Sequence, residues 1–183
     1  MTTARPPYLP GDKPPAADVA AMIRVDHAGE YGAVRIYDGQ LAVTGRGRGR
    51  DEIRRMAEQE KRHLAAFDEL VVARRVRPTA LQPLWHAAGY LLGAATALLG
   101  ERAAMACTVA IEEVIDEHYR AQAEQLGDNE PALAGLVRDF RADELRHRAA
   151  AIEHGATEAF GYGPLAAAIK TGSRLAIWLS QRL

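Results

Sequence analysis

The stretch EQEKRHLAAFDEL at residues 58–70 decides the fold, because it sets a Glu-x-x-His motif inside an apolar pattern of helical period. Its Glu60 and His63 lie three positions apart, which on an α-helix places a carboxylate and an imidazole on one face. The same motif recurs with Glu144 and His147. The two copies predict two helices that offer these four side chains to a shared metal site.

Two further helical segments each carry one glutamate on the apolar side, Glu30 and Glu112. The apolar residues in line with Glu30 are Ile23, Val34 and Tyr37, and those in line with Glu112 are Met105, Val109, Ile115 and Tyr119. A carboxylate on an apolar helix face is costly unless a cation or a metal pairs with it. One glutamate from each of two helices, added to two Glu-x-x-His motifs, is the ligand pattern of a bundle with two iron or manganese ions. The absence of thiolates from this set disfavours structural zinc.

The pattern repeats along the chain. The two glutamates of a pair are 30 residues apart in the first half and 32 in the second, and Tyr37 and Tyr119 each follow the first glutamate by seven residues. Two similar helical hairpins are what a metal site with approximate twofold symmetry requires. Either tyrosine could pack in the core or face a bound substrate.

Apolar periodicity predicts an all-α chain without strands: a ferritin-like four-helix bundle with a hydrophobic insert helix and a C-terminal amphipathic helix. The predicted bundle helices run over 18–43, 51–74, 101–126 and 131–154, the insert over 84–99 and the amphipathic helix over 164–183. Residues 1–17 hold five of the nine prolines and predict a flexible arm before one domain over 18–183. The GRGRGR run at 45–50 predicts a loop.

Charge and cysteine content limit the function classes. The 183 residues carry 23 basic and 24 acidic side chains, so the net charge of −1 gives no overall attraction to nucleic acid. Cys107 is the single cysteine, and no apolar run follows a basic start near the first residue. Both features argue against a secreted, disulfide-linked protein and favour a reducing compartment that faces the cytoplasm.

The motifs DHAGEYGA at 26–33 and AMACTVAIEEVIDEHY at 104–119, together with the closing RLAIWLSQRL, resemble the demethoxyubiquinone hydroxylase family over about residues 20–183. The resemblance implies two iron ions per chain and dioxygen as co-substrate. The ligands it implies are Glu30, Glu60, His63, Glu112, Glu144 and His147. It also implies ring hydroxylation of a polyprenylated methoxy-methyl benzoquinol, a late step of ubiquinone biosynthesis, by a protein peripheral to the cytoplasmic face of the cell membrane. Electrons would come from the quinol or from NADH, although the chain has no Gly-rich dinucleotide fingerprint.

Several alternatives stay open. The apolar segments 84–99 and 164–183 could contact a lipid surface, a second copy of the chain or a partner protein of quinone biosynthesis. A ferritin-like iron-oxidising or peroxide-scavenging protein would use the same ligands, and a non-enzymatic helical scaffold would use none. His27 could support a ligand or stabilise a helix interface. The acids that could orient ligand imidazoles or instead pair with arginines are Asp26, Asp116 and Asp143.

Overall fold

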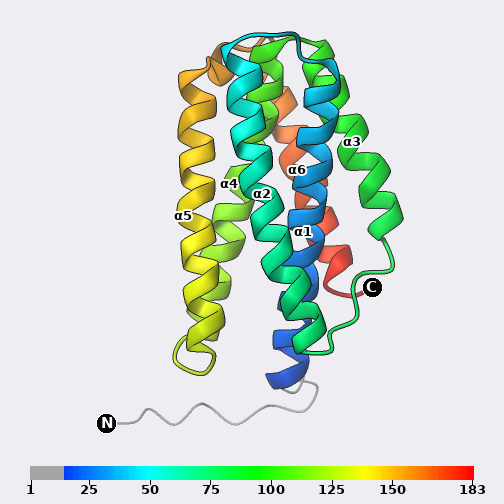
Figure 1. Ribbon diagram of the computed structural model, residues 1–183, viewed down its shortest axis with the longest axis vertical. Helices are drawn as coiled ribbons and strands as arrows, with labels where there is room; N and C mark the ends of the chain where they lie inside the picture. The colour runs from blue at the N-terminus through cyan, green and yellow to red at the C-terminus, as the bar shows by residue number, and fades with distance from the viewer. Residues whose placement is uncertain (1–14) are drawn as a thin grey trace.

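The computed structural model describes residues 15–183, with side chains from residue 18 onward, and contains six α-helices and one 3₁₀ turn (Figure 1). The elements are α1 (Pro15–Val43), α2 (Arg48–Ala73), α3 (Gln82–Leu98), α4 (Glu101–Leu126), α5 (Pro131–Glu153), η1 (Ala156–Glu158) and α6 (Tyr162–Ser180). These residues include no strand, so the all-α prediction is confirmed. Of the predicted arm, residues 1–14 lie outside the described residues, and Pro15 already begins α1.

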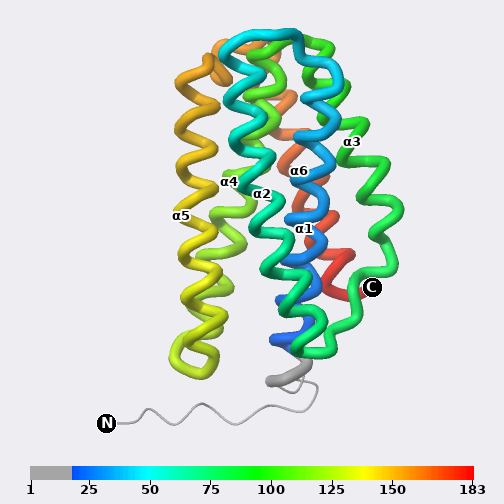
Figure 2. The backbone as a smooth tube through the Cα atoms, viewed as in Figure 1, coloured from blue at the N-terminus to red at the C-terminus, as the bar shows by residue number. Residues whose placement is uncertain are grey.

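Helices α1, α2, α4 and α5 form the four-helix bundle, with their axes along the length of the molecule (Figure 1). Short connections make hairpins of α1 with α2 and of α4 with α5, and each hairpin packs along its length. Helices α3 and α6 lie outside the bundle, where α3 packs on α1 and α6 on α4. Figure 2 shows the connection between α2 and α3 running along the outside of the bundle. This arrangement is the ferritin-like bundle that the sequence predicts.

Two apolar clusters divide the interior of the bundle. One cluster, near the α1–α2 turn, contains Tyr37, Ile53, Met56, Met105, Val109 and Ala151. The other, toward the opposite end, contains Ile23, Phe67, Tyr119, Leu126, Leu133 and Val137. On every bundle helix the glutamate singled out in the sequence falls between residues of the two clusters. Burial of the two apolar clusters therefore stabilises a bundle that has a polar layer in its middle.

The structure corrects the predicted loop at 45–50, because α2 already begins at Arg48. Arg50 donates through Nη1 to the backbone carbonyls of Leu41 and Thr44, which would otherwise lack partners at the end of α1. Gly49 is buried against Glu101, and a Cβ at this position would lie 2.1 Å from the Glu101 carboxyl carbon. The helix thus extends into the glycine-rich run, where Arg50 binds the end of α1 and Gly49 packs against Glu101.

Helix α3 approaches α1 more closely than ordinary side chains allow. A Cβ at Gly93 would lie 1.9 Å from the carbonyl oxygen of Ile36, so the two backbones touch. The indole Nε1 of Trp85 donates to Ser180 Oγ at 3.0 Å, which joins α3 to α6. Among the described helices, none has both the length and the apolar content needed to cross a bilayer.

Candidate metal centre

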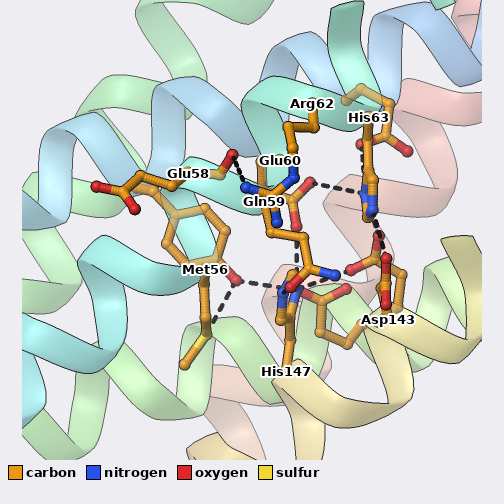
Figure 3. Close-up of polar contacts among 12 residues, drawn as sticks. Met56, Glu58, Gln59, Glu60, Arg62, His63, Asp143 and His147 are labelled. Carbon is orange, nitrogen blue, oxygen red and sulfur yellow. Dashed lines mark hydrogen bonds and ion pairs between the residues drawn. The ribbon is translucent and has the colours of Figure 1, made fainter. Parts of the chain in front are cut away.

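The polar layer of the bundle consists of four carboxylates and two imidazoles contributed by four helices. They are Glu30 of α1, Glu60 and His63 of α2, Glu112 of α4, and Glu144 and His147 of α5. Each of the six is at most 4% exposed. The structure thus brings together all six residues singled out in the sequence, and Figure 3 shows part of this layer around Glu60 and His147.

The first half of the layer surrounds His63. Its Nδ1 lies 3.0 Å from Glu144 Oε1, 3.6 Å from Glu30 Oε2 and 3.9 Å from Glu60 Oε2. One potential ligand atom from each of these four residues lies within 4.8 Å of the others. The four atoms could hold one metal ion.

The second half surrounds His147. Its Nδ1 lies 3.0 Å from both Glu60 Oε1 and Glu144 Oε2, and 3.9 Å from Glu112 Oε1. These four residues also place ligand atoms within 4.8 Å of one another. Because Glu60 and Glu144 belong to both groups, two ions would share these two carboxylates.

The hydrogen bonding within the layer is incomplete in a way that fits a cation. Glu30 Oε2, Glu60 Oε1, Glu144 Oε1 and His63 Nδ1 are buried, and none has a well-directed hydrogen bond within the described part of the chain. A buried polar atom without such a partner costs free energy, and more so when it is charged. Carboxylate oxygens and imidazole nitrogens are ligands that suit iron and manganese. The buried Glu and His clusters therefore fit a metal site.

The carboxylates and imidazoles of the polar layer shift one another's pKa values. Burial, followed by repulsion from Glu144, raises the pKa of Glu60 and of Glu112 well above the ordinary value of 4.5. Burial also acts to raise the pKa of Glu144, but the close contacts of its carboxylate with His147 and His63, at 3.0 Å each, lower it to about 2. Although burial acts against their protonation, the contacts with Glu144 and with neighbouring carboxylates raise the pKa values of both histidines to about 9. Such crowded negative charge favours cations.

Two buried tyrosines hold the carboxylates of Glu30 and Glu112, the outer glutamates, each of which belongs to only one half of the layer. Tyr37 OH donates to Glu112 Oε1 at 3.1 Å, and Tyr119 OH donates to Glu30 Oε1. Burial and then nearby carboxylates raise the pKa of each phenol well above 10, so both phenols stay protonated donors. Of the two roles left open by the sequence, the structure shows core packing for both tyrosines, and their hydroxyls also contact the polar layer.

Two further side chains contact the outward nitrogens of the imidazoles. Asp143 Oδ2 lies 3.0 Å from His63 Nε2, and Gln59 Oε1 lies 3.2 Å from His147 Nε2 (Figure 3). The sequence suggests Asp143 for this role but does not single out Gln59. The repeat itself could have found Gln59, because each of the two residues directly precedes the glutamate of a Glu-x-x-His motif.

The other polar side chains considered in the sequence serve helix packing. His27 contacts Asp68 at 2.9 Å, which joins α1 to α2. Asp26 accepts hydrogen bonds from His118 and Gln122, at 3.1 and 3.0 Å. Asp116 instead pairs with Arg141 of α5, so neither acid contacts a ligand imidazole.

Comparisons with known proteins agree with this geometry. The model of a family described as "Ubiquinone biosynthesis protein COQ7" matches residues 17–180. A curated relative from Rhodospirillum rubrum, named 3-demethoxyubiquinol 3-hydroxylase, is 56% identical over 176 residues, which cover 96% of this chain and 83% of the relative. A human relative, named NADPH-dependent 3-demethoxyubiquinone 3-hydroxylase, mitochondrial, is 51% identical over 91% of this chain and 79% of its own length. A Saccharomyces cerevisiae relative, named 5-demethoxyubiquinone hydroxylase, mitochondrial, is 39% identical over 92% and 79%.

Proposed function

The chain belongs to the COQ7 family of ubiquinone biosynthesis proteins, and from this premise we propose that it hydroxylates the ring of a demethoxyubiquinol. The substrate is a polyprenylated methoxy-methyl benzoquinol, and dioxygen supplies the inserted oxygen atom. The observation that carries the proposal is the buried layer of four carboxylates and two imidazoles, whose ligand atoms form two overlapping groups. Burying such a polar layer in the middle of a bundle costs free energy unless a cation such as a metal ion pairs with the carboxylates.

In this proposal Glu30, Glu60, His63, Glu112, Glu144 and His147 hold two iron ions. Iron bound there would supply the activation of dioxygen, a reaction that no side chain of the protein carries out alone. Glu60 and Glu144 would contact both ions, because each belongs to both groups.

The protein's own contribution is to hold these ligands in place and to keep water away from them. The contacts at Nε2 of His63 and His147 turn the Nδ1 atoms toward the carboxylates. The ring of Phe140 stacks on His63 with 4.0 Å between centroids and covers that side of the imidazole. Tyr119 holds Oε1 of Glu30, which leaves Oε2 of that glutamate near His63 for a metal, and Tyr37 holds Oε1 of Glu112.

The electrons come from outside the helical bundle in this proposal. The sequence has no Gly-rich dinucleotide fingerprint, so either the quinol itself or a reduced nicotinamide supplies them. NADH was the expectation from the resemblance, whereas the human relative is named for NADPH. Comparing turnover with NADH, with NADPH and with quinol alone distinguishes these donors.

A lipid surface is the proposed source of the substrate, because a polyprenyl quinol partitions into bilayers. Leu91, Leu98 and Leu99 along and just after α3 are 64–74% exposed, and Trp178 of α6 is 51% exposed. The guanidinium of Arg182 lies 4.2 Å from the Trp178 ring centroid, an arrangement suited to the interface between lipid tails and head groups. The proposal places the protein on the cytoplasmic face of the membrane. Flotation with vesicles tests lipid binding, and sedimentation tests the alternatives of a homo-oligomer or a protein partner.

The decisive assay follows isotopic oxygen. Purified protein with Fe(II), a reductant, ¹⁸O₂ and demethoxyubiquinol should yield a quinol that carries one ¹⁸O atom. Glu112→Ala and His147→Ala should abolish the product, whereas Glu113→Ala should retain it, because Glu113 lies outside the ligand groups and pairs with the partly exposed Arg148 and Lys170. Consumption of Fe(II) and oxygen without a labelled quinol would support the ferritin-like alternative and refute this function.

A further inference from the structure

The contacts around the polar layer cross from one helical hairpin to the other. Tyr119 of the second hairpin donates to Glu30 of the first, and Tyr37 of the first donates to Glu112 of the second. The outer glutamates of the two halves therefore have the same kind of partner.

The imidazole contacts also cross between the hairpins, but here the two halves differ. His63 of α2 contacts the carboxylate of Asp143 on α5, whereas His147 of α5 contacts the amide of Gln59 on α2. The distances are similar, 3.0 and 3.2 Å, and both contacts involve Nε2. The chemical difference between the halves is thus a carboxylate in one place and a neutral amide in the other.

This difference affects how well each imidazole binds a metal. A carboxylate that accepts the Nε2 proton forms a charge-assisted hydrogen bond and makes the opposite nitrogen a stronger ligand. An amide oxygen orients the ring in the same way without adding charge. Arg146 pairs with Asp143 but is 68% exposed at its side chain, so solvent screens much of its opposing charge.

We propose that the two ion positions are unequal, and that the position formed by His63, Glu30, Glu60 and Glu144 fills first because Asp143 supports its imidazole. Asp143 and Gln59 are positioning residues, which act on the ions through His63 and His147. The inference rests on the two-ion site of the proposed function. Contacts of this kind typically change metal affinity about 10- to 100-fold, which sets the expected gap between the two binding events.

The first test locates a single ion. Metal-free protein crystallised with one equivalent of Mn(II) should show an anomalous diffraction peak beside His63 that is much stronger than any peak beside His147. Calorimetric titration with Mn(II) should show two events whose affinities differ about 10- to 100-fold. Equal peaks, a stronger peak beside His147, or one class of equal sites would overturn the inference while leaving the two-ion site intact. Failure to bind any Mn(II) or Fe(II) would refute the proposed site as well.

Exchanging the two side chains supplies matched variants. Asp143→Asn should weaken the first event about 10- to 100-fold and make the sites nearly alike, whereas Gln59→Glu should strengthen the second event. The double variant should move the first Mn(II) peak to His147. A purely structural role would instead weaken both events in both variants, and that result contradicts the proposal. Gln59→Glu keeps the test decisive if Asp143→Asn proves unstable, because the expected change is a gain in affinity.

Discussion

Replacing Glu112 by Gln should stabilise the metal-free protein and should reduce the increase in Tm that metal binding causes. Glu112 is 3% exposed, and burial together with the charge of Glu144 raises its pKa. An amide of nearly the same shape removes one ionisable carboxyl from the crowded layer, and its oxygen can still accept the hydrogen bond from Tyr37.

The expected size follows from other buried charges. A buried polar group without adequate partners costs about 1–3 kcal/mol, and more when it is charged, so a neutral replacement of the Glu112 carboxyl should recover about this amount. In a domain of this length, 1 kcal/mol shifts Tm by about 2–4 °C, so about 2 kcal/mol would raise Tm by roughly 4–8 °C. Bound metal should favour the wild-type protein instead. Each ion at 100 times its Kd adds about 2.7 kcal/mol to the free energy of unfolding, and the variant lacks a ligand for one of the two ions.

Calorimetry of both proteins, with a chelator and with excess Mn(II), tests this reversal. The variant should unfold at the higher temperature with chelator and show the smaller increase with Mn(II). Glu113→Gln is the matched control, because Glu113 pairs with the partly exposed Arg148 and Lys170 outside the ligand groups, and this variant should keep the full response to Mn(II). A lower Tm of metal-free Glu112→Gln, or an unchanged response to Mn(II), would show that the account of the polar layer is mistaken.

Three further predictions concern positions outside the polar layer. Gly93→Ala should lower stability by about 1–3 kcal/mol in chemical denaturation, because its Cβ would collide with the backbone of α1, whereas Gly172→Ala, with no atom within 4 Å of its Cβ, should not destabilise α6. Burial raises the pKa of Cys107 to about 12, so iodoacetamide should leave this thiol unmodified in the native protein at pH 8 and alkylate it after unfolding; rapid native alkylation would contradict its burial. Arg74 lowers the pKa of Glu130, so the stabilising contribution of this pair is present above the unfolded pKa of Glu130 and is lost as pH falls through the folded value. Arg74→Ala should therefore raise the Glu130 pKa toward 4.5 in an NMR titration, and an unchanged value would contradict the pairing.

Much of the fold could be predicted because helix ends are marked locally. The predicted helix at 101–126 agrees with α4 at both ends, where Gly100 precedes it and Gly127, at φ 47°, follows it. The predicted start of α2 was wrong by three residues, because the glycine-rich run does not reveal that Arg50 binds the end of α1 or that Gly49 packs against Glu101.

The convergence of the six site residues could also be expected from the sequence, because each glutamate interrupts an apolar helix face. Their partners were harder to predict. That Asp143 contacts His63, rather than the histidine of its own helix, depends on how α2 and α5 face each other. The role of Gln59 likewise depends on this pairing of helices, and a single helical pattern does not encode it.

The most direct test of the central claim is the quinone profile of cells that lack this protein. The account predicts that the demethoxy precursor accumulates and ubiquinone falls, and that the wild-type chain restores the normal profile whereas His147→Ala does not. An unchanged quinone pool in the deletion, or full restoration by His147→Ala, would contradict it.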